Sequence, residues 1–410
     1  MGTEFLKIKE VSEANNIIKE LFKELYSPKS EEIAIENSYK KVLFKDIKSS
    51  IDLPLFNRSL KDGFALNSYD SFKASEENPI LLKCIDSVEA GSYSKKTIKK
   101  GECIEISTGA PIPKGADAVA MVEFSEKNDD EVSIFKSVTP TQDIAIKGSD
   151  IEKNKLLLKK KTILSPDKIG VLSAQGIKKI TTFKSPKISV ISTGNELLKE
   201  NEEMKFGKIY DVNTNTIKNA ALSCGAEAIA EKIVKDSYDD LKSTIQHAVK
   251  SSDIVICSGG TSAGVGDVLR HVLHDIGKVI IHGISVKPGK PTIIGKIDDK
   301  IIIGLPGNPV SALIIFYVFI APNIRKLAGL KEIEKNRIVF ATLSKRLHSA
   351  KGRMQYSLVK LKDNVVIPII KDSGAITSLV DADGYVKIPK SVELIDEGEE
   401  VKVTLFNDKL

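Results

Sequence analysis

The chain has 410 residues, a formal net charge of +6, and 41% hydrophobic and 28% charged residues, which is typical of a folded protein with about two to four domains. No run approaches the ~20 apolar residues of a membrane span, and the N-terminal sequence does not resemble a signal peptide. We therefore expect a cytoplasmic protein without a membrane partner. The chain has no tryptophan and only 6% aromatic residues, which argues against a nucleic-acid partner.

Cysteine and histidine give little sign of a metal site. No pair of the four cysteines has zinc-ligand spacing, so we expect reduced, structural thiols in a cytosolic protein. His271 and His274 lie three residues apart on a predicted helix, where an exposed helix face is favoured over a metal pair because no third ligand is evident.

The first 150 residues contain one β-rich region. Short apolar segments alternate with turn residues between 80 and 147, which predicts several short strands. Within this region, 107–117 form a long loop rich in proline and glycine, and such loops are often functional. Asp62, which a glycine follows, and Asp150 each stand in a turn signal, and the signal at Asp62 predicts a hairpin turn.

From residue 187 onwards, strands alternate with helices, which predicts a parallel sheet. The strand at 187–193 leads into a loop that contains Glu196, and a second strand, at 228–234, ends next to Asp236. Each carboxylate is interpreted either as a ligand-binding group or as a helix cap. The helix between these strands has three candidate N-caps, Asn213, Thr214 and Thr216.

A glycine-rich loop follows the next predicted strand, at 254–257. Ligands of open α/β sheets bind at this end of a strand, and glycines let the backbone approach a ligand closely. The following helix begins near Asp267, which could cap it or hold a metal, and ends at Gly277, the expected C-cap. The candidate binding residues of this strand end and loop are Ser258, Gly259, Gly260, Thr261 and Ser262.

Two further loops of this region are suited to anions. Residues 286–291 read Val-Lys-Pro-Gly-Lys-Pro, a stiff turn that presents Lys287 and Lys290 either to a di-anion or to solvent. A later strand leads through Leu-Pro-Gly to Asn308, the expected N-cap, with Pro309 in the first helical position, where free N–H groups favour anions. Together the loops predict a phosphorylated ligand, with Mg²⁺ held by carboxylates.

Several of these segments, taken together and in order, resemble the MoeA-type molybdopterin molybdenumtransferases, which are related to the E domain of gephyrin. The resemblance covers nearly the whole chain. Each motif is modest alone, and their order makes the set specific. The matching segments are 53–59, 62–65, 108–111, 115–119, 148–151, 192–197, 258–260, 287–291 and 305–311.

The resemblance implies an architecture and a reaction. It implies insertion of molybdate into adenylylated molybdopterin with release of AMP, Mg²⁺ as cofactor, and a homodimer whose active site is shared between subunits. The fold class is multidomain α/β plus β, with a central parallel-sheet domain and a C-terminal domain resembling a β-barrel. The expected domains are a linker domain at 1–50 and 148–185, an inserted β domain at 51–147, the α/β domain at 186–330 and the C-terminal β domain at 331–410.

Residue roles follow from position in the matching motifs. The resemblance implies catalytic roles for Asp62, Asp150, Asp267, Lys287 and Lys290, with Asp267 and Asp62 at the metal. The substrate-binding residues that it implies are Thr108, Glu196, Asp236, Ser258, Gly259, Gly260, Thr261, Ser262, Pro306, Gly307, Asn308 and Pro309.

The sequence departs from the family pattern at Leu60-Lys61, Ser149 and Val265, and the last two stand where an acid is common. These differences bear on how a metal is held. Two other functions stay open: a molybdopterin adenylyltransferase, which shares the α/β domain, and a non-catalytic cofactor carrier or scaffold. The additional β domains argue against the first, and the retained acids and lysines argue against the second.

Overall fold

The computed structural model describes residues 8–198, 201–230, 233–259, 265–332, 337–372 and 374–406, with no side-chain description for 265–267. The chain forms two compact units. One comprises residues 45–178, and the other comprises the rest of the chain, Met1–Phe44 and Lys179–Leu410.

The larger unit contains a six-stranded sheet. Its first four strands run parallel, and the fifth is antiparallel to both of its neighbours. Of the two central strands, β15 is buried along its whole length and β19 at all but its first residue, because helices cover both faces. The order is β14 (Glu227–Ala230), β13 (Lys187–Thr193), β15 (Ile254–Gly259), β19 (Lys300–Leu305), β18 (Ile293–Ile297) and β16 (Lys278–His282).

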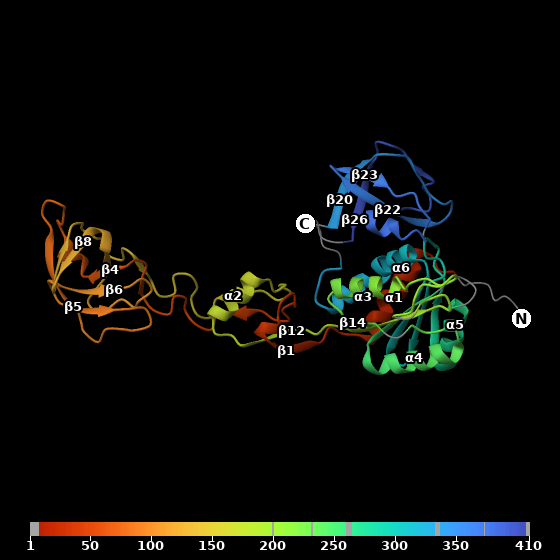
Figure 1. Ribbon diagram of the computed structural model, residues 1–410, viewed down its shortest axis with the longest axis horizontal. Coiled ribbons are helices and arrows are strands. Elements are labelled where there is room, and N and C mark those ends of the chain that lie inside the picture. Colours follow the sequence, from red (N-terminus) through yellow and green to blue (C-terminus); the bar gives the residue numbers. More distant parts are fainter. Residues whose placement is uncertain are drawn as a thin grey trace, which may run out of the picture. The chain divides into compact units, whose positions relative to one another are not determined.

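Helices lie on opposite faces of this sheet (Figure 1). One face packs against α4 (Tyr238–Ser251) and α5 (Val265–Ile276). The other face packs against α1 (Val11–Leu25), α3 (Asn213–Ser223) and a helical run at 309–327. That run consists of α6 (Pro309–Ile315), a π-helical turn (Phe316–Ile320) and α7 (Ala321–Leu327).

The helical run Pro309–Leu327 is long and apolar enough to cross a membrane by length and composition alone. However, 72% of its most apolar window is buried inside the protein, and its side chains belong to the main hydrophobic core. It is therefore accounted for as a core helix.

The C-terminal part of the larger unit is a closed β-barrel. Five strands pair in the order β22-β23-β20-β26-β24, and β24 returns to pair with β22, so no edge is left open. This confirms the predicted class of multidomain α/β plus β, with a barrel-like C-terminal domain. The strands are β20 (Ile338–Leu343), β22 (Met354–Lys362), β23 (Val365–Pro368), β24 (Gly384–Ile388) and β26 (Glu400–Leu405).

Smaller elements complete this unit. A two-stranded ribbon, β1 (Ser30–Ala34) with β12 (Lys179–Phe183), leads to the boundary of the other unit. A short helix, α8 (Thr377–Asp381), and the ribbon β21 (Leu347–His348) with β25 (Leu394–Ile395) flank the barrel.

The smaller unit is built on a six-stranded sheet. The predicted β-rich region is confirmed, and the sheet order is β7 (Ala118–Met121), β4 (Gly63–Leu66), β6 (Glu102–Ile106), β5 (Ile80–Val88), β9 (Glu131–Ile134) and β8 (Ser125–Asn128). Short ribbons pair β10 (Ile144–Ala145) with β3 (Arg58–Ser59) and β11 (Leu156–Leu158) with β2 (Ile47–Lys48), and α2 spans Pro166–Ala174.

One local prediction is wrong. The Asp62-Gly63 hairpin turn does not form, because Gly63 is the first residue of β4 and pairs with Ile106 and Met121. A Cβ at Gly63 would lie 1.9 Å from the Ala120 carbonyl oxygen, so close strand packing explains this glycine.

Gly277 directly follows the last residue of α5 and its N–H donates to the carbonyl oxygen of Leu273 at 3.1 Å, so the predicted C-cap is confirmed, although its backbone is not left-handed. A Cβ there would lie 2.4 Å from the carbonyl oxygen of Lys296, so the approach of strand β18 requires the glycine.

Candidate functional site

Three parallel strands end at one edge of the central sheet. Thr193 of β13 is in register with Gly259 of β15, and Ser258 of β15 is in register with Leu305 of β19. The loops that follow these strands therefore share the carboxyl edge, where α/β sheets bind ligands. Of the predicted loop residues, Gly260, Thr261 and Ser262 lie outside the described residues, as does the side chain of Asp267.

A buried asparagine joins the end of β15 to the loop that follows β19. The Asn213 Nδ2 donates to Ser258 Oγ at 2.9 Å and to the carbonyl oxygen of Gly307 at 2.6 Å. Ser258 Oγ in turn donates to the carbonyl oxygen of Pro306 at 3.4 Å. Three predicted binding residues are thus brought together, and the residue that connects them was expected only as a helix cap.

The cap of α3 comes from a different residue. Asn213 and Thr214 already lie inside the helix, so the predicted N-caps are wrong. Asp211 Oδ1 accepts from the N–H of Thr214 at 3.2 Å and from Ser192 Oγ at 3.0 Å, and Thr214 Oγ1 donates to Ser192 Oγ at 2.7 Å. The first turn of α3 is therefore fixed to the end of β13.

Glu196 and Asp236 are neighbouring carboxylates at the same edge. Burial raises the pKa of the Asp236 carboxyl, and the negative charge of Glu196 acts in the same direction. Asp236 Oδ1 is buried and has no hydrogen-bond partner within the described part of the chain. Paired carboxylates with an unpaired buried oxygen suit a hard divalent cation.

The capping interpretation of these two acids is wrong. Glu196 lies in a turn that leads into no helix, and its carboxylate packs over Gly194. Helix α4 begins after Ser237, whose side chain accepts from the N–H of Asp240 at 3.2 Å. Asp236 therefore does not cap α4, and its carboxylate is not used in that way.

The proline-rich loop at 287–291 is fixed from both sides. At its start, β17 (Val286–Lys287) pairs with β22 of the barrel, and just after its end Thr292 Oγ1 donates back to the carbonyl oxygen of Gly289 at 2.7 Å. Gly289 has φ +109°, and a Cβ there would lie 2.4 Å from Ile315 of α6. Only glycine fits this turn.

The loop borders a cleft of about 800 Å³ between the sheet edge and the barrel. Lys287 is exposed and Lys290 is half-buried, and neither has an ion-pair partner among the described residues. Pro306 and Asn308, two of the predicted binding residues, also line the cleft.

The barrel contributes residues that sequence reasoning missed. Arg353 and Ser378 line the same cleft, and Arg353 likewise has no carboxylate partner within the described part of the chain. Arg346 and Lys371 also line it, but they pair with Asp396 and Asp381 respectively. Glycines before Arg353 and Ser378 marked loops in the sequence, but nothing in their spacing connected these loops with 287–291.

The remaining predicted residues lie in the smaller unit. Asp62 Oδ1 accepts from the N–H of Thr108 at 2.7 Å, and this hydrogen bond lowers the pKa of Asp62. Asp150 is exposed, and its N–H donates to the carbonyl oxygen of Leu53 at 3.0 Å. Asp62 and Thr108 are thus brought into direct contact.

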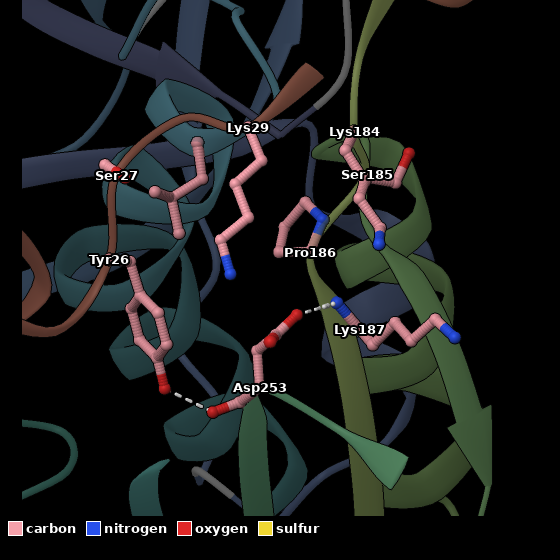
Figure 2. A pocket seen from close by; sticks show the side chains of 9 residues that line it. Tyr26, Ser27, Lys29, Lys184, Ser185, Pro186, Lys187 and Asp253 are labelled. Atoms are coloured by element: carbon pink, nitrogen blue, oxygen red, sulfur yellow. Dashed lines mark hydrogen bonds between the residues drawn. The ribbon is translucent and has the colours of Figure 1, made fainter. Parts of the chain in front are cut away.

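A second, smaller cavity of about 150 Å³ lies at the opposite edge of the sheet, where β13 and β15 begin (Figure 2). Its polar contacts are structural. The Tyr26 hydroxyl donates to the carbonyl oxygen of Asp253 and accepts from the N–H of Ile301, and the Asp253 carboxylate accepts from the N–H of Lys187 at 2.9 Å. The cavity marks where the chain after α1 is anchored to the sheet, and the carboxyl edge remains the candidate site.

Comparisons with known proteins agree with this geometry. Three family models match: the MoeA N-terminal region (domain I and II) at 9–176, a molybdopterin-binding domain at 189–326, and the MoeA C-terminal region (domain IV) at 341–406. A molybdopterin molybdenumtransferase of Staphylococcus aureus is 33% identical over 91% of this chain and 90% of its own.

A relative with the same name from Staphylococcus epidermidis is 32% identical over 95% of this chain and 94% of its own. The crystal structure of a molybdopterin biosynthesis MoeA protein from Pyrococcus horikoshii superposes with a TM-score of 0.84 at 41% identity. It covers 98% of this chain and 100% of its own.

Proposed function

Because the chain belongs to the MoeA family of molybdopterin molybdenumtransferases, we propose that the cleft beside Lys287 and Lys290 takes molybdate and the phosphorylated part of adenylylated molybdopterin. The protein is a transferase of molybdenum cofactor biosynthesis. One observation carries the proposal: Lys287, Lys290 and Arg353 line one cleft, and none has a carboxylate partner among the described residues. Uncompensated cations in a concave site attract anions.

The cations have distinct tasks in such a reaction. When the adenylyl link is hydrolysed, negative charge shifts onto the leaving phosphate oxygens. The fixed ammonium groups of Lys287 and Lys290 would hold the oxyanion and stabilise that developing charge. The planar guanidinium of Arg353 would orient phosphate or molybdate through two parallel hydrogen bonds.

The residues present fit a magnesium ion. The carboxylates of Glu196 and Asp236 would hold it, since Mg²⁺ is usually bound by one or two carboxylates together with substrate phosphates. The described residues contain no cluster of three or more potential metal ligands, so substrate phosphates or water would have to supply the other ligands. Bound Mg²⁺ would polarise the phosphate bond. Whether Asp267 and Asp62 also take part stays a prediction.

We place Asp62, Thr108 and Asp150 at the active site of the partner subunit of a cytoplasmic homodimer. Two features support this: the residues are exposed, and they belong to a separate compact unit. Asp62 is held by Thr108 in an ionised state, ready to accept a hydrogen bond from a substrate.

The experiment is AMP release from adenylylated molybdopterin by the purified protein with Mg²⁺, with and without molybdate. Molybdate-dependent release is expected, and tungstate in place of molybdate measures the preference between two oxyanions of similar size and charge. Tight binding of the substrate without release would contradict the proposal and support a carrier.

A further inference from the structure

We infer that Asn213 is a positioning residue of this enzyme, which clamps the end of strand β15 to the Pro306–Gly307 loop and so sets the shape of the substrate site. The inference rests on the proposed function. The clamp itself is visible in the hydrogen bonds of one side-chain amide, which spans three elements of the carboxyl edge.

The Asn213 amide uses both of its N–H groups in the clamp. One hydrogen goes to Ser258 Oγ at 2.9 Å and the other to the carbonyl oxygen of Gly307 at 2.6 Å. Ser258 is the penultimate residue of β15, immediately before Gly259 and the glycine-rich loop, and Gly307 immediately precedes the Asn308-Pro309 start of α6. The end of β15 and the Pro306–Gly307 loop are therefore held by one side chain.

The position of this amide is determined by its surroundings. Asn213 is only 8% exposed, and its neighbour Thr214 is tied through Ser192 and Asp211 to the end of β13. The side chain is therefore anchored on a rigid helix, α3, which fixes the positions of the groups to which it donates.

The oxygen atom of the Asn213 amide indicates a role beyond packing. Asn213 Oδ1 is buried and has no hydrogen-bond partner within the described part of the chain. An unpaired buried acceptor is costly, so a residue whose only task was to fill space would be apolar at this position. Asparagine suits this position because, among uncharged side chains, a carboxamide donates two hydrogen bonds from one nitrogen.

A kinetic comparison tests the inference. Asn213→Ala should lower kcat/KM for adenylylated molybdopterin on the order of 10²-fold, since small displacements of supporting residues misplace the reacting groups. Asn219→Ala is the matched control, because Asn219 lies on the same helix, is exposed and bonds only to the Asn215 carbonyl oxygen. Equal kinetics for the two variants would overturn the inference.

An isosteric variant covers the case in which Asn213→Ala does not fold. Asn213→Asp keeps the shape but replaces the donor that faces the Gly307 carbonyl oxygen, so the loop should be released and turnover should fall. An Asn213→Asp enzyme with wild-type kinetics would likewise overturn the clamp.

Hydrogen exchange separates this inference from the proposed function. The amides within 305–310, at Leu305, Gly307, Asn308 and Val310, should exchange at least about tenfold faster in Asn213→Ala than in wild type, while those of the barrel stay unchanged. This readout needs no substrate, so it holds even if the wild-type protein shows no molybdate-dependent AMP release. Unchanged exchange at 305–310 would show that Asn213 does not hold the loop.

Discussion

Lys290 shows how much a single side chain is expected to contribute. Lys290→Ala removes a half-buried cation that has no carboxylate partner among the described residues, so kcat/KM should fall about 10²-fold. The free energy of unfolding should change by less than about 0.5 kcal/mol, because no ion pair is broken. Lys184→Ala, at the opposite edge of the sheet, is the control and should leave AMP release unchanged. A Lys290→Ala enzyme with the wild-type rate would show that this lysine does not act on the substrate.

Asp236 gives a pH-dependent prediction at the same scale. Burial holds its pKa above the ordinary value, so its ionisation opposes folding. As pH rises from about 4, where unfolded aspartate titrates, through the raised value in the folded protein, the wild type should lose stability relative to Asp236→Asn. Below about pH 4 the two should unfold at equal temperature. Thermal melts from pH 3 to 8 without metal measure this trend, with exposed Asp363→Asn as control.

Mg²⁺ should reverse the difference in stability between the wild type and Asp236→Asn. A cation that neutralises the Asp236 carboxylate raises the wild-type unfolding temperature at pH 8 and leaves that of Asp236→Asn nearly unchanged. If the unfolding temperature of Asp236→Asn rose with Mg²⁺ as much as that of the wild type, Asp236 would not be a ligand of the metal.

At the scale of an element, the 287–291 loop gives a prediction about how a substitution at Gly289 affects stability and activity. Gly289→Ala introduces a Cβ at 2.4 Å from Ile315 on a backbone with φ +109°, so the turn and α6 must separate. We expect a loss of about 2–4 kcal/mol from the positive φ and overpacking together, with reduced activity because both lysines move. Gly398→Ala isolates the first term, since its φ is +86° and no atom lies within 4 Å of the added Cβ. If the two variants lost equal free energy of unfolding, the Ile315 side chain would move aside without destabilising the fold.

The shared active site is a prediction for the whole molecule. Asp62→Ala and Lys290→Ala should each lose most of their activity alone, Lys290→Ala by the factor of about 10² given above. In mixed homodimers, one site per heterodimer combines an intact 45–178 unit with an intact cleft, so random mixing should restore about a quarter of the wild-type rate. No recovery, with heterodimers verified by mass, would show that each subunit builds its own site.

Sequence determined the elements of this protein because their signals are local. The apolar runs of β13, β15 and β19 and the spacing of α5 are readable from nearest neighbours alone. The family was indicated by the ordered set of motifs, which includes the prolines and the glycine of the 287–291 loop. The capping roles of Glu196 and Asp236 failed, because an acid before a helical pattern looks the same whether or not it caps.

Only the tertiary structure decided which side chains meet. Asn213 is 45 residues from Ser258 and 94 from Gly307, so no local pattern could assign its amide to both. Arg353 reaches the cleft of Lys287 because β17 pairs with a barrel strand, a contact between distant segments. Side-chain direction depends on how elements pack, and packing is a property of the whole fold, which periodicity along the chain does not encode.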